Sequence, residues 1–533
     1  MDFNHSISVY SEVGQLKKVL VHCPDIGIGG VTPSKAQEWL YEDIVHLERM
    51  QKEFEVFKKI LLAYLDPEKL RQWIKIEKQN KKTLKRSIAS PRSELYVKSD
   101  KVIDVQDLLA DILEDEKVRT EIVSAICALE DKTYHFQNIL SDTKQLSANE
   151  LARILITGIV DHPEKLGLKN NMVWSPAPNF LFTRDIGITI GKQILLSRPA
   201  SKARQRESML TRYIAYHYFF KGKEENVIEI NNDSLSFLYT DEDRQKSRVT
   251  IEGGDVMAVS PKHLLIGASE RTTLNACQKT INKLFKDQCC DIERISIVQL
   301  PKQRAMMHLD TVMTQVTRNT WVLFKQLLEG ESYTKDEQIL IDLGANPYNG
   351  HTVDPAKVTQ FIRKNLEGDY EINSHIKDLK ALLTDISVRE YGCKEDEVEF
   401  IYSADGELIH AEREQWTDSC NVTAIREGVV LGYDRNDKTA LCFKEKGFAL
   451  IDVEELVNEL TQLINNDENA NIENFLNDNV PQKSLLMLPS GELSRARGGP
   501  HCMTMPIERE ALMEKLKPVE YVEEKNAQIS LVG

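Results

Sequence analysis

Four segments that follow residue 170 share one pattern, and this repetition restricts the folds open to the chain. Each segment opens with Asp or Asn, continues as an apolar strand, turns at a short polar link and returns as a second apolar strand. The segments begin at Asp185, Asp255, Asp310 and Asn421. Two apolar runs joined by such a link are typical of a β-hairpin. The repetition predicts one supersecondary unit that is used several times.

A helical stretch and a further strand are expected after the hairpins, so the predicted unit is hairpin, helix, strand. The stretches expected to be helical are 206–220, 273–285 and 354–366, and the further strands are 227–231, 295–300 and 399–403. Segment 8–24, with its apolar run Val19 to Val21, adds an N-terminal strand unit. About five units fit, and a ring of them would remove sheet edges and gather the first residues of the hairpins around one centre.

Helical patterning separates the N-terminal strand unit from these repeats. Between Tyr41 and Leu65 apolar side chains recur every three or four residues, and similar patterns continue to about residue 165. We therefore predict an α/β protein in three parts. These are a first strand unit at 1–40, an inserted helical domain at 41–165 and the remaining repeats at 166–533.

The composition argues against several classes of protein. The chain has 533 residues, with 83 acidic against 68 basic side chains and a formal net charge of −15. This charge repels a phosphate backbone, so nucleic acid is not expected as a partner, whereas a small cation is favoured. Nine cysteines without a Cys-x-x-Cys pair, and no recognisable leader, predict a cytoplasmic protein. No apolar stretch reaches the roughly 20 residues that cross a bilayer, so no membrane association is expected.

Four polar clusters lie where the repeat would bring them together. They are Asn179 to Asp185, Glu252 to Asp255, His308 to Asp310, and Arg495 to Met503. Each cluster alone is more often structural, but their joint occurrence predicts one site. Hydrolysis of a neutral peptide bond by a cysteine needs one orienting group, and several carboxylates would add nothing to it. A guanidinium ion, which is planar, cationic and rich in N–H donors, does need several carboxylates.

The same residues suggest how such a site would work. Asp185 and Asp310 are the carboxylates that we expect to grip the edges of a guanidinium. The central carbon of guanidinium is a poor electrophile because of resonance, so a positioned thiolate attacks it better than water does. Cys502 would supply this thiolate, and the bound cation would stabilise it.

The motifs FTRD, EGGDV, MHLDTV and GGPHCMTMP occur in this order, together with EREQWTDSCNV and VVLGYDRN. In these motifs the chain closely resembles the arginine deiminase family, a guanidine-modifying branch of the pentein superfamily. The resemblance extends from SEVGQLKKVLVH to HCMTMPI. It implies a five-bladed α/β propeller, hydrolysis of L-arginine to L-citrulline and ammonia in arginine catabolism, and no metal or organic cofactor.

The resemblance also implies a role for each matching residue. Cys502 would attack the guanidinium carbon and form a covalent amidino-thioether, and His308 would act as general acid and then as general base. Glu252 would orient His308, while Asp185 and Asp310 hold guanidinium nitrogens. The residues implied to bind the rest of the substrate are Asn179, Arg204 and Arg271 at the α-carboxylate, Phe182 at the aliphatic stem, the carbonyls of Leu40 and Ala496 at the α-amino group, and Arg497 on a movable cover loop.

Some residues depart from the family pattern. Ala496 and Pro500 replace glycines in the cover loop, which predicts a stiffer loop. Lys35 and Trp39 occupy a turn near the α-amino end, where the family has a short polar residue and a leucine. These changes bear on whether free arginine is the preferred substrate.

Other functions fit part of the same pattern. The chain could act on agmatine or a methylated arginine, or transfer the amidino group to an amine, although Arg204 and Arg271 would find no carboxylate on agmatine. It could bind arginine without catalysis, but binding alone needs neither Cys502 nor His308. A zinc site at His308, Asp310 and Cys502 lacks the usual ligand spacing. Homo-oligomerisation is left open.

Overall fold

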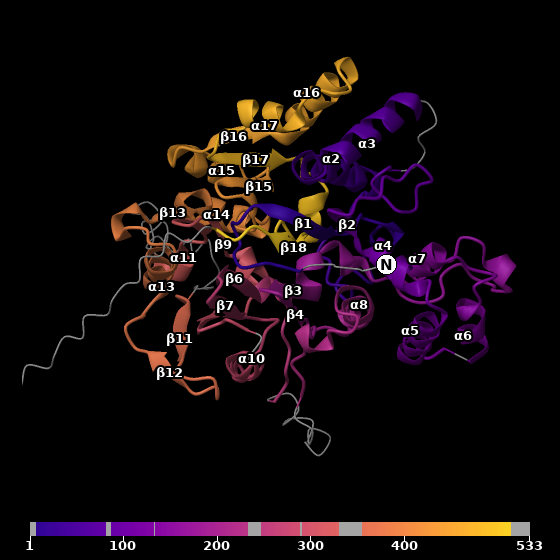
Figure 1. Ribbon diagram of the computed structural model, residues 1–533, viewed down its shortest axis with the longest axis horizontal. Coiled ribbons are helices and arrows are strands. Elements are labelled where there is room, and N and C mark those ends of the chain that lie inside the picture. The colour runs from indigo at the N-terminus through magenta and orange to yellow at the C-terminus, as the bar shows by residue number, and fades with distance from the viewer. Residues whose placement is uncertain are drawn as a thin grey trace, which may run out of the picture.

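The computed structural model describes residues 7–80, 87–132, 134–232, 247–287, 290–329 and 354–512. Within these residues the strands form five sheets in a mixed α/β fold (Figure 1). In sheet order they are β3 (Gly187–Ile190), β4 (Gln193–Leu196) and β5 (Val227–Ile228); β12 (Tyr370–Asn373), β11 (Lys357–Arg363), β8 (Arg294–Gln299), β7 (His263–Ala268) and β6 (Val256–Ser260); β13 (Glu399–Tyr402), β10 (Thr320–Leu323) and β9 (Met313–Thr317); β14 (Thr423–Arg426), β15 (Val429–Tyr433), β17 (Ser484–Leu488) and β16 (Ala449–Asp452); and β18 (Met505–Arg509), β1 (Leu16–Val21) and β2 (Val102–Asp104).

The five sheets share one arrangement. A leading strand, which is β3, β6, β9, β14 or β18, pairs antiparallel with its neighbour, and that neighbour pairs in parallel with a third strand. The first four leading strands belong to the hairpins expected from the sequence, which are confirmed. In the last sheet, β18 near the end of the chain pairs with β1 near its beginning, and the two lie side by side in the middle of Figure 1.

Side-chain hydrogen bonds join neighbouring leading strands. The Thr189 hydroxyl on β3 donates to the Pro506 carbonyl on β18 at 2.9 Å. The Thr314 hydroxyl on β9 donates to the carbonyl of Cys420, just before β14, at 2.7 Å. The strands that lead the five repeats therefore converge, and the residues that precede them are brought together.

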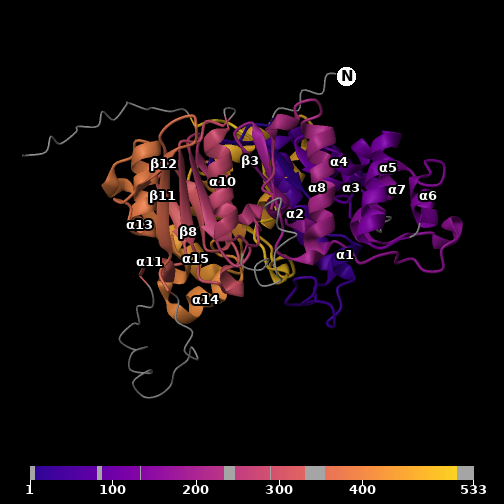
Figure 2. The ribbon, with the colours of Figure 1, turned by 90° about the horizontal axis from the view of Figure 1, so that it is seen from below.

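Helices cover the sheets (Figure 2). Their bounds are α1 (Ile26–Gly29), α2 (Leu47–Leu65), α3 (Pro67–Asn80), α4 (Val105–Leu113), α5 (Glu116–Leu129), α6 (Tyr134–Ser141), α7 (Ala148–Thr157), α8 (Gln205–Ile214), α10 (Leu274–Lys286), α11 (Gln326–Glu329), α13 (Leu379–Asp385), α14 (Leu408–Trp416), α15 (Asp437–Glu445), α16 (Val453–Asn466) and α17 (Ile472–Asn479). Among the described helices, none combines the length and the apolar character of a membrane span.

The segment from 41 to 165 is mainly helical, as expected, but it contributes to two cores. Apolar side chains of α2 and α3 pack with those of α16 and α17, and these four helices lie together at the top of Figure 1. Helices α4 to α7 form another core with α8. The same segment supplies β2, which pairs in parallel with β1. The division into three parts stays a prediction.

The helix expected at 354–366 is wrong. Lys357–Arg363 is strand β11, which pairs antiparallel with β8 on one side and with β12 on the other. Val358, Thr359 and Ile362 are β-branched and favour a strand, and two available sheet edges decide the outcome for a short apolar run of ambiguous period.

Candidate active site

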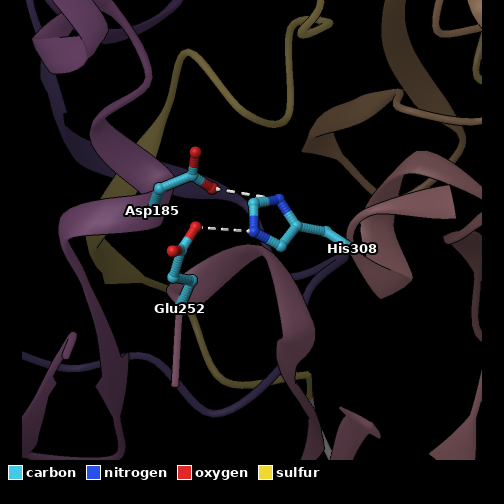
Figure 3. A group of neighbouring side chains, drawn as sticks. All are labelled: Asp185, Glu252 and His308. Carbon is cyan, nitrogen blue, oxygen red and sulfur yellow. Dashed lines mark hydrogen bonds and ion pairs between the residues drawn. The ribbon is translucent and has the colours of Figure 1, made fainter. Parts of the chain in front are cut away.

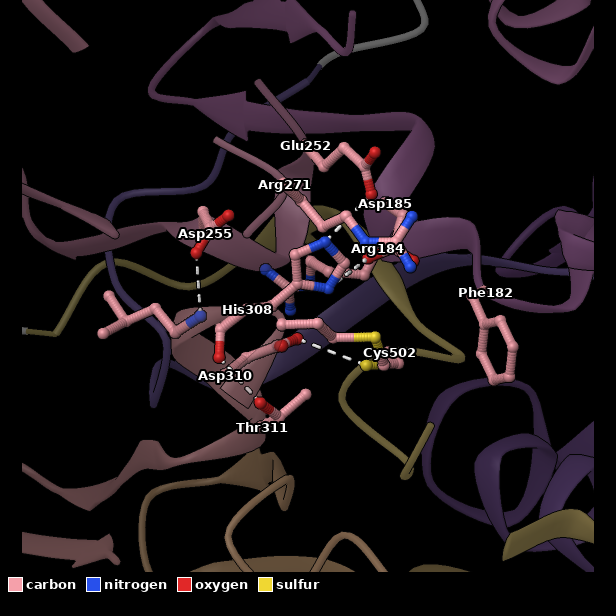
Figure 4. A network of polar contacts seen from close by, with 12 residues as sticks. Phe182, Arg184, Asp185, Glu252, Asp255, Arg271, His308, Asp310, Thr311 and Cys502 are labelled. Atoms are coloured by element: carbon pink, nitrogen blue, oxygen red, sulfur yellow. Dashed lines mark hydrogen bonds and ion pairs between the residues drawn. The ribbon is translucent and has the colours of Figure 1, made fainter. Parts of the chain in front are cut away.

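The ends of the leading strands carry the side chains of the site. Asp185 precedes β3, Asp255 precedes β6, Asp310 precedes β9, Asn421 precedes β14 and Cys502 precedes β18. All five are buried, with no more than 6% of any of them exposed. Figure 4 shows four of these positions, Asp185, Asp255, Asp310 and Cys502, in one polar cluster, and hydrogen bonds to Cys502 and to the Asp310 carbonyl add Asn421 to it.

Cys502 lies between a carboxylate and a carboxamide. Its Sγ is 3.5 Å from Asp310 Oδ2 and 3.2 Å from Asn421 Nδ2. Burial raises the pKa of the Cys502 thiol well above its usual range, and the charges of Asp310 and Asp185 raise it further. The thiol therefore needs a nearby cation to ionise at neutral pH.

His308 is held between two carboxylates (Figure 3). Its Nε2 lies 2.9 Å from Glu252 Oε2, and its Nδ1 lies 3.6 Å from Asp185 Oδ1. Burial alone lowers the pKa of His308, but Asp185, Glu252 and Asp255 outweigh it and raise that pKa to about 9. Burial opposes ionisation of Glu252, yet the hydrogen bond with His308 lowers the pKa of Glu252 to about 2. The pair is thus an imidazolium and a carboxylate at neutral pH.

Asp310 is held by His501 at the same carboxylate oxygen that Cys502 contacts. Its Oδ2 accepts a hydrogen bond from His501 Nδ1 at 2.9 Å, and His501 Nε2 lies 3.2 Å from Glu12 Oε2. Glu12 in turn contacts the guanidinium of Arg184. Burial raises the pKa of Asp310, but the hydrogen bond from His501 outweighs it and lowers that pKa below its ordinary value. Asp310 is therefore a carboxylate whose orientation is set by a chain of buried ion pairs.

Three buried polar atoms around this centre are left without partners. Asp185 Oδ1, His308 Nδ1 and Asp310 Oδ1 make no hydrogen bond within the described part of the chain. Buried polar groups in proteins are usually satisfied, and each unsatisfied one costs about 1 to 3 kcal/mol. The two carboxylate oxygens are suited to accept from a buried ligand with several N–H donors, whereas His308 Nδ1, 3.6 Å from Asp185 Oδ1, carries a proton that it can donate.

Arg204, expected at a substrate carboxylate, is bound inside the chain. Its Nη1 donates to Asp185 Oδ2 at 2.6 Å, and its Nε donates to Glu207 Oε2 at 2.7 Å. Its Nη2 donates to the main-chain carbonyl of Asn179 at 3.1 Å. Arg204 thus braces Asp185 in this structure, and a substrate carboxylate would have to displace one of these acceptors.

Arg271 and Phe182 are the other residues expected along the substrate. Arg271 is buried, and its Nε makes no hydrogen bond within the described residues, although Glu270 Oε1 lies 3.6 Å away. Phe182 stands apart from the polar cluster in Figure 4. Its ring packs so closely on Gly498 of the cover loop that a Cβ there would lie 2.3 Å from the ring. Asn179 Nδ2 donates to the carbonyl of Trp39 at 3.0 Å.

Leu40 and Arg497 meet through Arg304 in a second group. Arg304 Nη2 donates to the Leu40 carbonyl at 2.7 Å, and the Arg304 carbonyl accepts from Arg497 Nη2 at 3.4 Å. The Arg497 guanidinium also stacks on the Trp416 ring, 3.6 Å from its centroid. Ala496, which precedes Arg497, is buried. The sequence-based residues are therefore placed in two groups, one at Cys502 and the other at the cover loop.

Asp185, Glu252 and His308 are also the one group of potential metal ligands found among the described residues, with ligand atoms within 4.8 Å of one another. Two features favour an organic cation over a metal ion. His308 is protonated at neutral pH, and the Arg204 guanidinium already lies beside Asp185. A metal ion would have to displace both positive charges.

Sequence reasoning missed several residues of this centre. Asn421, His501 and Glu12 contact the nucleophile or the carboxylate beside it. Asp255 accepts from the main-chain N–H of Leu309 at 2.9 Å and so fixes the turn between His308 and Asp310. One signal existed for Asn421, because it opens the fourth repeat at the position that the other repeats fill with Asp.

The comparison with known families agrees with this centre. The family model described as arginine deiminase matches residues 92–465. The chain belongs to the arginine deiminase family. It is therefore an enzyme of that family, as expected from its motifs, and the expectation of a hydrolase is confirmed.

Individual relatives support the same conclusion. The arginine deiminase of Borrelia garinii subsp. bavariensis is 29% identical over 517 residues, which cover 95% of this chain and 98% of the relative. The arginine deiminase of Treponema denticola is 28% identical over 512 residues, again with 95% and 98% covered.

Solved structures give weaker likenesses. An amidinotransferase of Microseira wollei from a saxitoxin biosynthetic pathway covers 95% of this chain and 98% of its own, with 11% identity and a TM-score of 0.41. The N-terminal domain of a cyanobacterial arginine dihydrolase covers 63% and 78%, with 14% identity and a TM-score of 0.31.

Proposed function

We propose that this member of the arginine deiminase family hydrolyses L-arginine to L-citrulline and ammonia through a covalent intermediate on Cys502, as a step of arginine catabolism. The observation that carries the proposal is the pair of buried carboxylate oxygens, Asp185 Oδ1 and Asp310 Oδ1, which accept no hydrogen bond from the described residues and lie in the cluster around the Cys502 sulfur. A guanidinium ion presents N–H donors along its edges and one electrophilic carbon at its centre. It therefore matches both the acceptors and the nucleophile.

Binding of the guanidinium prepares the nucleophile. The cation brings a positive charge to a site where burial and carboxylates otherwise keep the Cys502 thiol protonated. The thiol loses its proton to solvent, the thiolate attacks the guanidinium carbon, and a C–S bond forms. His308, which carries a proton at neutral pH, gives it to one terminal nitrogen of the substrate, the C–N bond breaks and ammonia leaves. An amidino-thioether and a neutral imidazole remain.

The second half of the reaction reverses the role of His308. Its neutral imidazole removes a proton from a water molecule, and the resulting hydroxide adds to the amidino carbon. The C–S bond breaks, the thiolate returns, and the former guanidine becomes the urea group of citrulline. Glu252, 2.9 Å from His308 Nε2, keeps the ring oriented so that Nδ1 faces the substrate through both steps. The proton taken from the water stays on His308 and restores its imidazolium. The second proton of that water is lost to solvent when the carbonyl of the urea group forms, and the ammonia released earlier takes up a proton there as ammonium.

The α-carboxylate and the α-amino group of the substrate need charged and polar partners, and the cover loop must close over them. Arg271, with its unpartnered Nε, is the first cation proposed to meet the α-carboxylate, and Arg204 joins it only by exchanging an internal acceptor. Asn179 is proposed to bind the α-carboxylate as well, Phe182 to pack on the aliphatic stem, and Arg497 to close over the substrate. The Leu40 and Ala496 carbonyls are proposed to face the α-amino group.

The architecture belongs to the same proposal. The five sheets are proposed to be the blades of a five-bladed α/β propeller. Residues 1–40 and 166–533 form the blades except for β2, which the inserted, mainly helical segment 41–165 contributes to one of them. Pairing of β18 with β1 supports this, because it joins the two ends of the ring. The protein is proposed to work in the cytoplasm.

Product analysis tests the function directly. Purified protein is incubated with L-arginine, and citrulline, ornithine and ammonia are quantified beside a Cys502→Ser control. We expect equal amounts of citrulline and ammonia from the wild type and none from the control. Agmatine in parallel tests the nearest alternative substrate. Faster turnover of agmatine than of arginine, or release of ornithine in place of citrulline, would reject the proposal.

A further inference from the structure

Asn421 is the residue that touches Cys502 from the fourth repeat. Its Nδ2 donates to Cys502 Sγ at 3.2 Å and to the Asp310 main-chain carbonyl at 2.9 Å, while its Oδ1 accepts from the Cys502 main-chain N–H at 3.0 Å. The side chain is fully buried. Rotating the amide by half a turn would place an oxygen against the carbonyl and an NH2 group against the N–H, so its contacts fix the orientation.

We propose that Asn421 is a further catalytic residue, an uncharged donor that stabilises the Cys502 thiolate and fixes the sulfur beside Asp310. Its part in turnover rests on the function proposed above. Its effect on the thiol does not, because ionisation of Cys502 is a property of the protein without substrate.

The electrostatics of the site explain why this donor is uncharged. Burial and the carboxylates of Asp310, Asp185 and Asp418 all raise the pKa of the Cys502 thiol, whereas the hydrogen bond from Asn421 lowers it. An Arg or Lys at this position would stabilise a thiolate more strongly, but it would also pair with Asp310 and compete with a cationic substrate. A carboxamide offers an N–H without adding positive charge.

The repeat supports the same inference. Asp185, Asp255 and Asp310 occupy the corresponding position before the other hairpins, and the one that contacts the sulfur through a side-chain N–H is Asn. An Asp at 421 would remove this donor and bring a further carboxylate next to the thiolate. The repeat therefore carries Asn in place of Asp at the position where the Cys502 sulfur needs an N–H donor.

Gly499, three residues before Cys502, allows the close approach. A Cβ at this position would lie 2.7 Å from the Asn421 main-chain oxygen and 2.7 Å from Oδ1. The main-chain carbonyl of Asn421 also accepts from the His501 N–H at 3.3 Å. The loop that leads to the nucleophile thus packs closely against Asn421, at both its main chain and its side chain.

Titration of Cys502 in the absence of substrate tests the inference. The rate of iodoacetamide labelling of the Cys502 peptide is followed by mass spectrometry across pH, and thiolate absorbance is measured against Cys502→Ser. The variants are Asn421→Ala and the near-isosteric Asn421→Asp. Asn436→Ala is the matched control, since Asn436 is also buried but binds Thr417, its Nδ2 lying 3.0 Å from that carbonyl. Circular dichroism and thermal melting confirm that each variant folds.

Loss of one hydrogen bond to a charged group corresponds to roughly a 10- to 100-fold change, so the apparent thiol pKa should rise by about one to two units in Asn421→Ala. Asn421→Asp should raise the apparent thiol pKa further. In both variants kcat/KM for arginine should also fall by roughly 10- to 100-fold. Asn436→Ala should leave the thiol pKa unchanged. Should Asn421→Ala fail to fold, Asn421→Asp decides alone.

The two proposals fail in different ways. A folded Asn421→Ala or Asn421→Asp variant with the wild-type thiol pKa overturns the role of Asn421, whatever the enzyme acts on. If the wild type does not convert arginine but the thiol pKa responds as described, the proposed substrate is wrong and the role of Asn421 stands.

Discussion

Glu252 Oε2 and His308 Nε2 lie 2.9 Å apart, and both side chains are almost completely buried. This contact leaves Nδ1 as the nitrogen of His308 that faces the unpartnered oxygen of Asp185 and the remaining space of the site. It also makes His308 a proton donor at neutral pH, because the surrounding carboxylates raise its pKa to about 9. The order of proton transfers in the proposed reaction follows from this pair.

The pH dependence of the enzyme should report His308. A folded-state pKa of about 9 lies above the ordinary value, so the free energy that the pair contributes to folding is present below pH 6.5 and is lost as the pH rises through about 9. The general acid is lost over the same upper range. We expect kcat/KM for arginine to fall on the alkaline side, and Glu252→Gln to move that fall to lower pH by roughly one unit or more.

A second buried pair provides the control for this experiment. Glu390 Oε1, in the helical turn that follows α13, lies 3.2 Å from Nδ1 of His263 on β7. Glu390→Gln should leave the pH profile of kcat/KM in place. Superimposable profiles for Glu252→Gln and the wild type would remove His308 from its role as general acid.

Asp310→Asn should strongly weaken substrate binding. The variant turns an N–H group toward a guanidinium edge and loses the carboxylate charge that accepts the hydrogen bond from His501. By analogy with breaking a buried ion pair, the loss should be about 3 to 5 kcal/mol in kcat/KM. Asp452→Asn, at the N-terminus of α16, is the control, because Asn caps a helix about as well as Asp does. A loss of less than tenfold in kcat/KM for Asp310→Asn would show that this carboxylate does not bind the guanidinium.

Arg271 and Arg204 should respond differently to the choice of substrate. Arg271→Ala should raise KM for arginine far more than KM for agmatine, which has no carboxylate. Arg204→Lys should weaken both substrates, because Lys cannot bind Asp185 and Glu207 together in the geometry of the guanidinium. The measurement is KM and kcat for both substrates with each variant. Equal weakening of arginine and agmatine by Arg271→Ala would separate Arg271 from the carboxylate.

The internal ion pairs of Arg204 also predict a change in stability. Glu207 is fully buried one helical turn from Arg204, and burial raises the pKa of its carboxyl. Glu207→Ala leaves a buried guanidinium partly unpaired, and the expected loss is about 3 to 5 kcal/mol of unfolding free energy. Urea denaturation measures it, with the exposed ion pair partner Glu38→Ala as a control that should change little. An equal, small change in both variants would contradict the account of Arg204 as a brace.

Local features made much of the fold predictable. Each of the four hairpins carries its own alternation and its own turn within about fifteen residues, so the sequence alone specifies it. The pairing of β18 with β1 has no local signal, because it joins residues near opposite ends of the chain. The segment 354–366 was misassigned for a related reason. Its identity as a strand depends on the edges of β8 and β12, which only the tertiary fold supplies.

The site shows the same distinction between local and long-range information. Cys502 and the His308 to Asp310 turn are marked by their motifs, and they lie together in the structure. The roles of Asn421 and His501 depend on which repeat packs beside the nucleophile. The linear sequence does not specify that packing. From the sequence, Arg204 is a cation without an assigned partner. In the structure it pairs with Glu207, three residues further along the chain, and with Asp185.

Detection of the covalent adduct tests the central claim most directly. The wild-type protein is mixed with arginine, quenched in acid during turnover and digested, and the peptide that contains Cys502 is weighed. We expect an added mass equal to arginine less ammonia on Cys502, which appears before steady state and decays when substrate is exhausted. Turnover of arginine with an unmodified Cys502 peptide, together with activity in Cys502→Ser, would contradict the account.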